Sequence, residues 1–562
     1  MKVHARSAAA RGTSINTSTE VSAMPMQSLD TDELVFRWQG FVYTPGAPAG
    51  AASLSKLASE FARNLPAAAA RLKGAFFIEV QDKRSGQRYG FVDNSGLFHA
   101  FYSEKSISTS FLELLAAERA SVSEVDPAAL VEFFHFGYIS HGRTFFRRIR
   151  RIGPEEVLCS VPGKKIESYR KPVPGIENAP VCPLEQHMQV LSASATGESI
   201  SVDLTGGKDS RLLAVLLHYF GVPFELALSG KPGNTDIAIA EQVAKVLGRP
   251  LHVTYHNVDD FEASLPQLFA ICDGLFDVSK YHRLHHMQLE RIKRGVTLMV
   301  TGIGGELYKD FWWLQDFPFY SRKTPNLERL YSVRIAPLEP KHDYLAAPYR
   351  ELSHGYRNWL LKQLARYIGP SNAHTYDQIY YHFKMRDYGG RFVTNHLRHL
   401  YCVAPYLDRE AVAFGYSLPR SMRFFNSFHR QTMTRMLTEA AQIGTTEGGV
   451  SVSSRSGDMA ADLCKYVLNK FSRITRKLAQ RALQKTYFLE SPNNPELPAH
   501  LRAVVASRRS IERLKDYGVL RQDLRIDDVA NSYFGNILSL DLLLEAVESM
   551  ASVQATSPVL RA

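Results

Sequence analysis

Apolar and polar residues alternate in short runs through the first third of the chain. These runs lie at residues 34–44, 74–82 and 88–103. Alternation with a period of two is typical of strands, and the Gly-containing turns at 83–86 and 93–96 are of the kind that joins antiparallel neighbours. The pattern predicts antiparallel hairpins, followed by helices near 110–119 and 127–136.

After residue 183 the pattern changes to apolar strands that alternate with amphipathic helices. The expected strands lie at 199–204, 224–229, 251–256 and 296–301, and the expected helices at 184–196, 211–219, 235–247, 258–271 and 280–294. This alternation predicts a parallel sheet with helices on both faces. Residues 320–440 are expected to be mainly helical. The predicted fold class is therefore α/β, with an antiparallel β/α domain before a parallel-sheet domain that carries helical additions.

The length of the chain, 562 residues, exceeds what a single hydrophobic core usually supports. Residues 1–32 are rich in Ala, Ser and Thr and show no apolar period, so we expect a disordered tail. Four prolines within 172–183 indicate a linker. We expect one domain at 33–175, a second at 183–460, and a basic helical extension at 461–562.

The excess of 67 Lys and Arg over 56 Asp and Glu gives a net charge of +11. This balance is compatible with an acidic partner, such as a nucleotide, a peptide or nucleic acid, and equally with a surface that only keeps the protein in solution. The five cysteines are widely spaced without a C-x-x-C pair, so we expect neither a disulfide framework nor a zinc site. No apolar run reaches membrane-spanning length, and we expect a cytoplasmic protein without a membrane partner.

A glycine-containing loop at residues 204–210 follows the first strand of the predicted parallel sheet and precedes an apolar helix. Its glycines allow a sharp turn and a close approach to a ligand, and the amides at the helix start can hold an anion. The spacing is neither that of a Walker loop nor that of a dinucleotide-binding fold. We expect a phosphate site formed by Leu204, Thr205, Gly206, Gly207, Asp209 and Ser210.

A second glycine loop, residues 301–310, follows the fourth predicted strand and contains Gly302 and Glu306. A tight turn would explain either loop alone. Both loops are expected at the carboxyl edge of one sheet, where ligands of such sheets bind. Glycines that admit phosphates and acids that hold a hard cation through oxygen suit a nucleotide with Mg²⁺, with Asp209 and Glu306 as metal ligands.

The residues of the first loop, LTGGKDS, resemble the pyrophosphatase loop of the asparagine synthetase family. The segment around Asp236, the TGIGGE loop and CVAPYLDREAV at 402–412 are similar to further family segments in the same order. The runs at 74–82 and 88–103 resemble the family's N-terminal glutamine amidotransferase domain. The resemblance covers roughly 70–460 and implies an ATP-pyrophosphatase domain that uses ATP and Mg²⁺.

The sequence departs from the family where glutamine-using members begin with a nucleophilic cysteine. Met1 is followed by Lys2, and the first cysteine is Cys159. We therefore expect an amidotransferase-like domain without its nucleophile, and no glutamine hydrolysis. Family members with this loss include β-lactam synthetases and lasso-peptide macrolactam cyclases. They activate a carboxylate with ATP and let an amine of the same substrate attack it.

Cationic residues that the family carries late in the chain have no direct match. A lysine that neutralises phosphate charge in the family should lie near residues 428–435, where Arg430 is the nearest cationic candidate. A later lysine of the lactam-forming members has only Arg455 and Lys465 as possible equivalents. The resemblance thus implies Arg430 and Lys465 as catalytic candidates.

The resulting hypothesis is an AMP-forming amide synthetase that cyclises a lasso-type peptide through a macrolactam. The expected partners are a peptide or amino-acid-derived substrate and a leader-peptide-processing protease, but not nucleic acid. Three alternatives stay open: a small-molecule β-lactam-type or ammonia-dependent asparagine synthetase, an RNA-modifying ATP pyrophosphatase, and a scaffold without activity.

Overall fold

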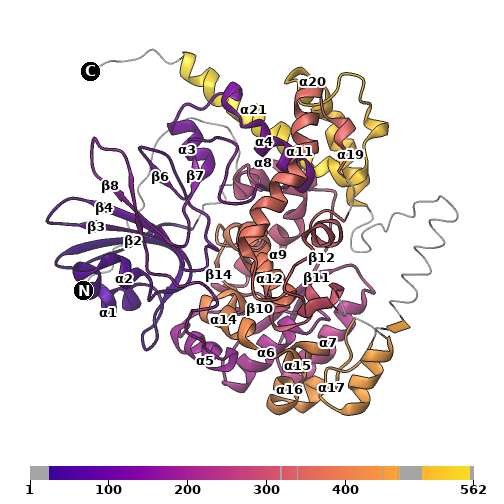
Figure 1. Ribbon diagram of the computed structural model, residues 1–562. Helices are drawn as coiled ribbons and strands as arrows, with labels where there is room; N and C mark the ends of the chain where they lie inside the picture. Colours follow the sequence, from indigo (N-terminus) through magenta and orange to yellow (C-terminus); the bar gives the residue numbers. More distant parts are fainter. Residues whose placement is uncertain are drawn as a thin grey trace.

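The computed structural model describes residues 24–316, 319–337, 340–446, 449–465, 467–468 and 496–556. An antiparallel sheet forms the first part of the molecule, and a parallel sheet surrounded by helices forms the centre (Figure 1). The predicted α/β fold class is confirmed. In the described residues, no helix combines the length and the apolar character that crossing a membrane requires.

The first sheet has six antiparallel strands in the order β1-β2-β3-β4-β8-β9. Strands β2 and β3 pair along their whole length, with Leu34 opposite Asp82 at one end. Two helices, α1 and α2, pack on the sheet, where the rings of Phe61 and Phe36 meet edge to face with their centroids 5.2 Å apart. The elements are β1 (Gln27–Asp30), β2 (Leu34–Tyr43), α1 (Ala51–Arg63), α2 (Leu65–Ala69), β3 (Lys73–Asp82), β4 (Arg88–Val92), β8 (Glu156–Ser160) and β9 (Glu167–Arg170).

The predicted hairpins are present, but the predicted tail ends too late. Strand β1 lies inside the segment 1–32 and pairs with β2, so the ordered chain begins before residue 33. Residues 1–23 lie outside the described residues. A small sheet and the two predicted helices follow: β5 (Phe101–Tyr102), β6 (Ile107–Ser108), α3 (Phe111–Ala117), α4 (Pro127–Phe136) and β7 (Arg150–Arg151).

The second sheet has five parallel strands in the order β12-β11-β10-β13-β14. The chain moves from β10 outward to β12 and then returns to place β13 on the other side of β10. The order of the strands therefore reverses between β10 and β13, which is where open parallel sheets bind ligands. The strands are β10 (Ile200–Asp203), β11 (Glu225–Gly230), β12 (Leu251–Tyr255), β13 (Leu298–Val300) and β14 (Tyr401–Val403). Four of them were predicted, whereas β14 was not.

Helices connect these strands, as the apolar periodicity predicts. Right-handed crossovers place α6 and α7 on one face of the sheet and α9 on the other. The ends of α7 follow from its sequence: the Asn234 side chain caps the first turn, and Gly248 ends the helix with φ +60°. The helices are α5 (Leu184–Ser194), α6 (Asp209–Tyr219), α7 (Thr235–Leu247), α8 (Phe261–Cys272) and α9 (His282–Lys293).

Residues 320–440 are mainly helical, as predicted. A π-helical segment at Tyr380–Gly389 joins α12 to α13 and leads back to β14. The α-helices of this region are α10 (Leu327–Leu330), α11 (Ala347–Leu364), α12 (Asn372–Ile379), α13 (Gly390–His396), α14 (Arg409–Ser417), α15 (Arg420–Arg423), α16 (Ser427–Met436) and α17 (Thr438–Gln442).

The last helices belong to the body of the molecule. Helices α19 (Leu497–Ser507), α20 (Ser510–Asp516) and α21 (Phe534–Thr556) share one hydrophobic core with α3, α4 and α8. Arginines of α20 and the turn before it pair with acids of α21, as Arg513 does with the buried Asp541. Helices α19, α20 and α21 of the predicted extension at 461–562 are therefore packed against the N-terminal half of the chain, whereas residues 466, 469–495 and 557–562 lie outside the described residues.

Phe534 provides a test of this shared core, because its side chain is 0% exposed at the start of α21. We expect Phe534→Ala to lower the free energy of unfolding by about 3–5 kcal/mol, because the cavity left behind cannot collapse fully. Urea unfolding of the full chain measures this change. Leu352→Ala on α11, where the side chain is 43% exposed, is the matched control and should have little effect. Equal stability of the two variants would contradict a core shared with α21.

Candidate active site

The first glycine loop (residues 204–210) connects the carboxyl end of β10 to the start of α6. The Thr205 amide donates to Ser210 Oγ over 3.1 Å, which closes the loop onto the first helical turn. The Gly206 amide donates to Asp236 Oδ1 over 3.0 Å, and the Gly207 amide to Thr205 Oγ1 over 3.3 Å. The loop is thus held by its own hydroxyls and by the first turn of α7.

The second glycine loop (residues 301–310) lies against the first, because β13 pairs in parallel with β10. A Cβ at Gly302 would lie 2.9 Å from the Ser210 nitrogen, and one at Gly305 would lie 2.4 Å from Asp209 Cγ. Neither distance is compatible with a side chain. The glycines are therefore needed for the contact between the two loops, and the structure brings Asp209, Ser210 and Gly302 together as predicted.

Asp209 opens α6 and is paired with two basic side chains. Lys309 Nζ lies 2.6 Å from its Oδ2, and His429 Nε2 lies 2.8 Å from its Oδ1. Burial alone raises the pKa of Asp209, but the Lys309 ammonium and the His429 ring outweigh burial and hold the pKa of this carboxyl well below its usual range. Asp209 is therefore ionised at neutral pH, in a site that offers compensating positive charge.

The contact between Asp209 and His429 is close, but it does not have hydrogen-bond geometry. Within the described residues, Asp209 Oδ1 and both ring nitrogens of His429 are buried without a hydrogen-bond partner. A buried polar atom without a partner is costly, so its presence at this loop indicates a place for a ligand or an ion.

Lys309 and His429 were not among the residues predicted from the sequence. Lys309 lies three residues after Glu306, in the loop that the glycines had already indicated. Its position in the sequence could therefore have identified it as a site residue. His429 precedes Arg430 on α16, and the sequence could not show which of these neighbours faces the loop. A difference of one residue turns a side chain about 100° around a helix.

The backbone at Lys309 is fixed by a buried ion pair. Arg423 pairs with Asp377 through two contacts of 2.5 and 2.7 Å. The same guanidinium donates to the Lys309 carbonyl oxygen over 3.0 Å. This arrangement holds Lys309 in front of Asp209 from the side of α12 and α15.

Arg430 does not have the surroundings of a phosphate ligand. Its guanidinium is buried and donates to the carbonyl oxygens of Phe425, Ser451 and Ser453, and it pairs with Asp462. The Phe425 and Asn426 residues have φ values of +48° and +61°, which non-glycine residues rarely adopt. Arg430 thus holds a strained turn before α16 and positions His429. Its placement does not support the predicted contact with phosphate.

The other late candidate, Lys465, is exposed. Its Nζ lies 3.9 Å from where a Cβ of Gly449 would stand. The catalytic role assigned to Lys465 stays a prediction.

Glu306 is held by a tyrosine of the π-helical segment. The Tyr380 hydroxyl donates to Glu306 Oε2 over 2.5 Å. Burial raises the pKa of Tyr380, and the nearby charges of Glu306 and Asp209 raise it further. Both carboxylates therefore lie close to this hydroxyl, although they come from different loops. The Tyr406 hydroxyl donates to the Asp209 carbonyl oxygen over 3.1 Å, so a second tyrosine contacts the residues of the site.

This donor set fits a hard divalent cation. Asp209 and Glu306 supply carboxylate oxygens from two loops, and Asp209 Oδ1 lacks a hydrogen-bond partner in the described residues. Oxygen ligands from a few carboxylates, completed by phosphate oxygens, are what Mg²⁺ prefers beside a nucleotide. The metal-ligand roles of the two residues stay predictions that the surroundings support.

Residues 190–386 match the asparagine synthase family model. The matched range contains both glycine loops, together with Lys309 and Tyr380. This stretch is therefore similar to an asparagine synthase domain. The family consists of ATP-dependent ligases, which typically use ATP with Mg²⁺. Among proteins of curated function, none matches the chain.

The stretch that matches the family model contains the close contact between Gly305 and Asp209. We expect Gly305→Ala to weaken Mg·ATP binding by about tenfold or more, because the added methyl group displaces the carboxylate by more than the loops can accommodate. Calorimetric titration of the full chain with Mg·ATP measures the effect. Gly355→Ala on α11, where a Cβ would meet nothing within 4 Å, should bind as the unchanged chain does. Normal binding by Gly305→Ala would contradict a nucleotide site at this contact.

Arg430 and the surface residue Arg435 lie on the same helix and test the positioning role. Arg430→Met leaves three carbonyl groups and Asp462 without a partner, and we expect a loss of stability of about 3–5 kcal/mol, as for other broken buried pairs. Arg435 pairs with Glu185 at the surface, so Arg435→Met should change stability by about 1 kcal/mol or less. Thermal unfolding compares the variants. Unchanged stability with weakened ATP binding in Arg430→Met would restore the phosphate role.

Proposed function

We propose that this protein uses ATP to join a carboxylate and an amine of the same substrate, and that the reaction is the macrolactam cyclisation of a lasso-type peptide. The asparagine synthase domain supports ATP-dependent amide-bond formation in general. The peptide substrate and the ring closure are inferences from the first domain and from the resemblance to glutaminase-deficient members of the family.

The reaction begins when a substrate carboxylate oxygen attacks the α-phosphorus of ATP. The bond to the bridging oxygen breaks, and pyrophosphate leaves with the negative charge. Amides of Gly206 and Gly207 and the Ser210 hydroxyl would bind this pyrophosphate. Mg²⁺ held by Asp209 and Glu306 would supply charge stabilisation for the leaving group.

In the second step, the amine nitrogen attacks the acyl carbon of the acyl-adenylate. The carbon–nitrogen bond forms, AMP leaves, and the amine loses a proton. For an amine of the same substrate, the protein's main contribution is to hold the two reacting atoms together. Such positioning can lower a barrier by about 7–11 kcal/mol in favourable cases.

The observation that carries the proposal is the state of the cysteine in the first domain. Cys159 is the only cysteine within residues 33–175, and it lies on β8, opposite Tyr89 of β4. Burial raises the pKa of the Cys159 thiol, whereas a nucleophilic cysteine needs a lowered pKa. Hydrolysis of glutamine by Cys159 is therefore disfavoured, and an amine of the substrate is the simplest source of nitrogen.

The first domain would also have a structural role without that chemistry, because it packs against the parallel sheet. The Gln27 amide of β1 donates to the Tyr401 hydroxyl of β14. The rings of Phe41 and Tyr401 meet edge to face with their centroids 5.7 Å apart. The antiparallel sheet thus contacts the edge strand of the parallel sheet and covers apolar surface there.

The predicted activity is tested by pyrophosphate release. With ATP, Mg²⁺ and a cognate peptide, we expect pyrophosphate, AMP and a peptide that has lost one water, which mass spectrometry detects. A short precursor-peptide gene and a protease gene beside this one would supply the peptide and the proposed processing partner. Asp209→Ala should lower the rate by about a hundredfold or more.

Cys159→Ser is the control, and its activity should equal that of the unchanged chain. Full activity of Asp209→Ala would contradict the role of the first loop. Pyrophosphate release with aspartate and ammonia, or with a small amino-acid derivative alone, would favour the alternative synthetases. Binding of tRNA that exceeds peptide binding at both low and high salt would favour an RNA-modifying enzyme.

A further inference from the structure

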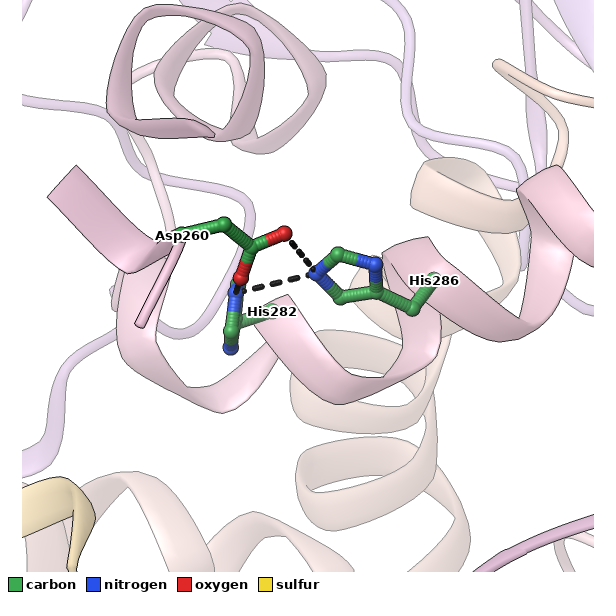
Figure 2. Close-up of side chains that lie close together, drawn as sticks. All are labelled: Asp260, His282 and His286. Atoms are coloured by element: carbon green, nitrogen blue, oxygen red, sulfur yellow. Dashed lines mark hydrogen bonds and ion pairs between the residues drawn. The ribbon is translucent and has the colours of Figure 1, made fainter. Parts of the chain in front are cut away.

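A cluster of metal-ligating side chains lies away from both glycine loops. Asp260 precedes α8, and His282 and His286 lie four residues apart on α9. That spacing places both rings on one face of the helix. Figure 2 shows the two imidazoles and the carboxylate converging on one point.

The donor atoms of the three residues lie close together. His282 Nε2 lies 3.1 Å from His286 Nε2 and 3.2 Å from Asp260 Oδ1, and His286 Nε2 lies 3.2 Å from Asp260 Oδ2. Ligands placed tetrahedrally at the usual bond lengths to zinc are about 3.3 Å apart. The printed separations are therefore close to those between the ligand atoms of a tetrahedral zinc site, for which Asp260 offers either of its carboxylate oxygens.

We propose that Asp260, His282 and His286 bind one Zn²⁺ ion. Two imidazoles and one carboxylate form a zinc-type ligand set, whereas Mg²⁺ and Ca²⁺ select sites made of oxygen alone. Three protein ligands leave the fourth position to water or to a substrate group, as in zinc sites that are not purely structural.

Without a bound cation, every placement of the imidazole hydrogens leaves one unfavourable contact in this cluster. Each Nε2 carries at most one hydrogen in a neutral imidazole. If both hydrogens point to Asp260, the His282 and His286 rings face each other with N–H against N–H. If one points to the other histidine, a nitrogen lone pair faces a carboxylate oxygen. A cation between the three side chains satisfies all three contacts.

The surroundings leave room for one further ligand. The His282 side chain is 4% exposed, that of His286 26% and that of Asp260 40%, so the cluster is buried on one side and open on the other. A cavity of about 10 Å³ beside it is lined in part by His256 and Arg283. That volume is close to what one water molecule needs. Arg283 donates to Ser229 Oγ over 2.9 Å, which directs its charge away from the cluster.

The proposed ion would bridge the beginnings of α8 and α9 beside the end of β12. The expectation that this chain has no zinc site came from the spacing of its cysteines. It did not consider histidines and an aspartate contributed by two different helices.

Zinc titration of the untagged full chain, first treated with a chelator, tests the site. Calorimetry should give one Zn²⁺ per chain, and a bound Co²⁺ probe should show the visible absorption of a tetrahedral site. Losing a residue that hydrogen-bonds to a metal ligand lowers metal affinity by about 10–100-fold. His286→Ala and Asp260→Asn each change a ligand itself, so they should lower zinc affinity by more than this. Zinc should also raise the melting temperature of the unchanged chain but not that of His286→Ala.

Two variants serve as controls for this test. His285 lies on α9 but faces His399, with its Nδ1 3.3 Å from His399 Nε2, so His285→Ala should bind zinc normally. Asp209→Asn should also bind zinc normally, which separates this site from the nucleotide site. Circular dichroism shows whether each variant is folded. The proposal would be overturned if the unchanged chain did not bind zinc stoichiometrically. It would also be overturned if folded His286→Ala and Asp260→Asn bound zinc with the affinity of the unchanged chain.

Discussion

The ionised carboxylate of Asp209 is the constraint on which the candidate active site depends. A buried carboxylate is stable only with nearby positive charge or hydrogen bonds. Lys309 supplies that charge from the second glycine loop at 2.6 Å, and the His429 ring of α16, whose pKa burial lowers, lies 2.8 Å from the same carboxylate. Three segments far apart in the sequence are thereby fixed around the end of β10. Gly302 and Gly305 permit the approach, and Arg423 and Arg430 hold the backbone that carries the two basic residues.

The elements that carry a regular pattern could be predicted from the sequence. Four parallel strands and α7 are long enough for periodicity and caps to define them, and the glycines at the strand ends indicated the two loops. Strand β14, Tyr401–Val403, was missed because it lies within a region, residues 320–440, whose pattern is mainly helical. Lys309 and His429 were missed for another reason: their role arises from proximity to Asp209 in space. Arg430 was the predicted candidate, whereas its neighbour His429 faces the loop. Periodicity does not fix which face of α16 meets another element.

The predicted division of the chain into domains stays a prediction, and the hydrophobic cores of the structure do not follow the sequence in blocks. Residues before 150 share a core with α8 and with the last helices. The antiparallel sheet meets the parallel sheet through β14. Removing the antiparallel sheet would therefore expose the apolar surface that it covers.

The shared core of α4, α8 and α21 also constrains how the protein is made. Phe133, Leu268 and Leu543 belong to one cluster, yet hundreds of residues separate the first from the last. Contacts at such separation form late, because closing long loops costs entropy before the contacts stabilise the chain. During synthesis, the surface of α4 that contacts α21 stays uncovered until residues up to 547 have left the ribosome. Until then, the nascent chain exposes apolar surface. Such surface makes a folding intermediate prone to aggregation and a target for chaperones.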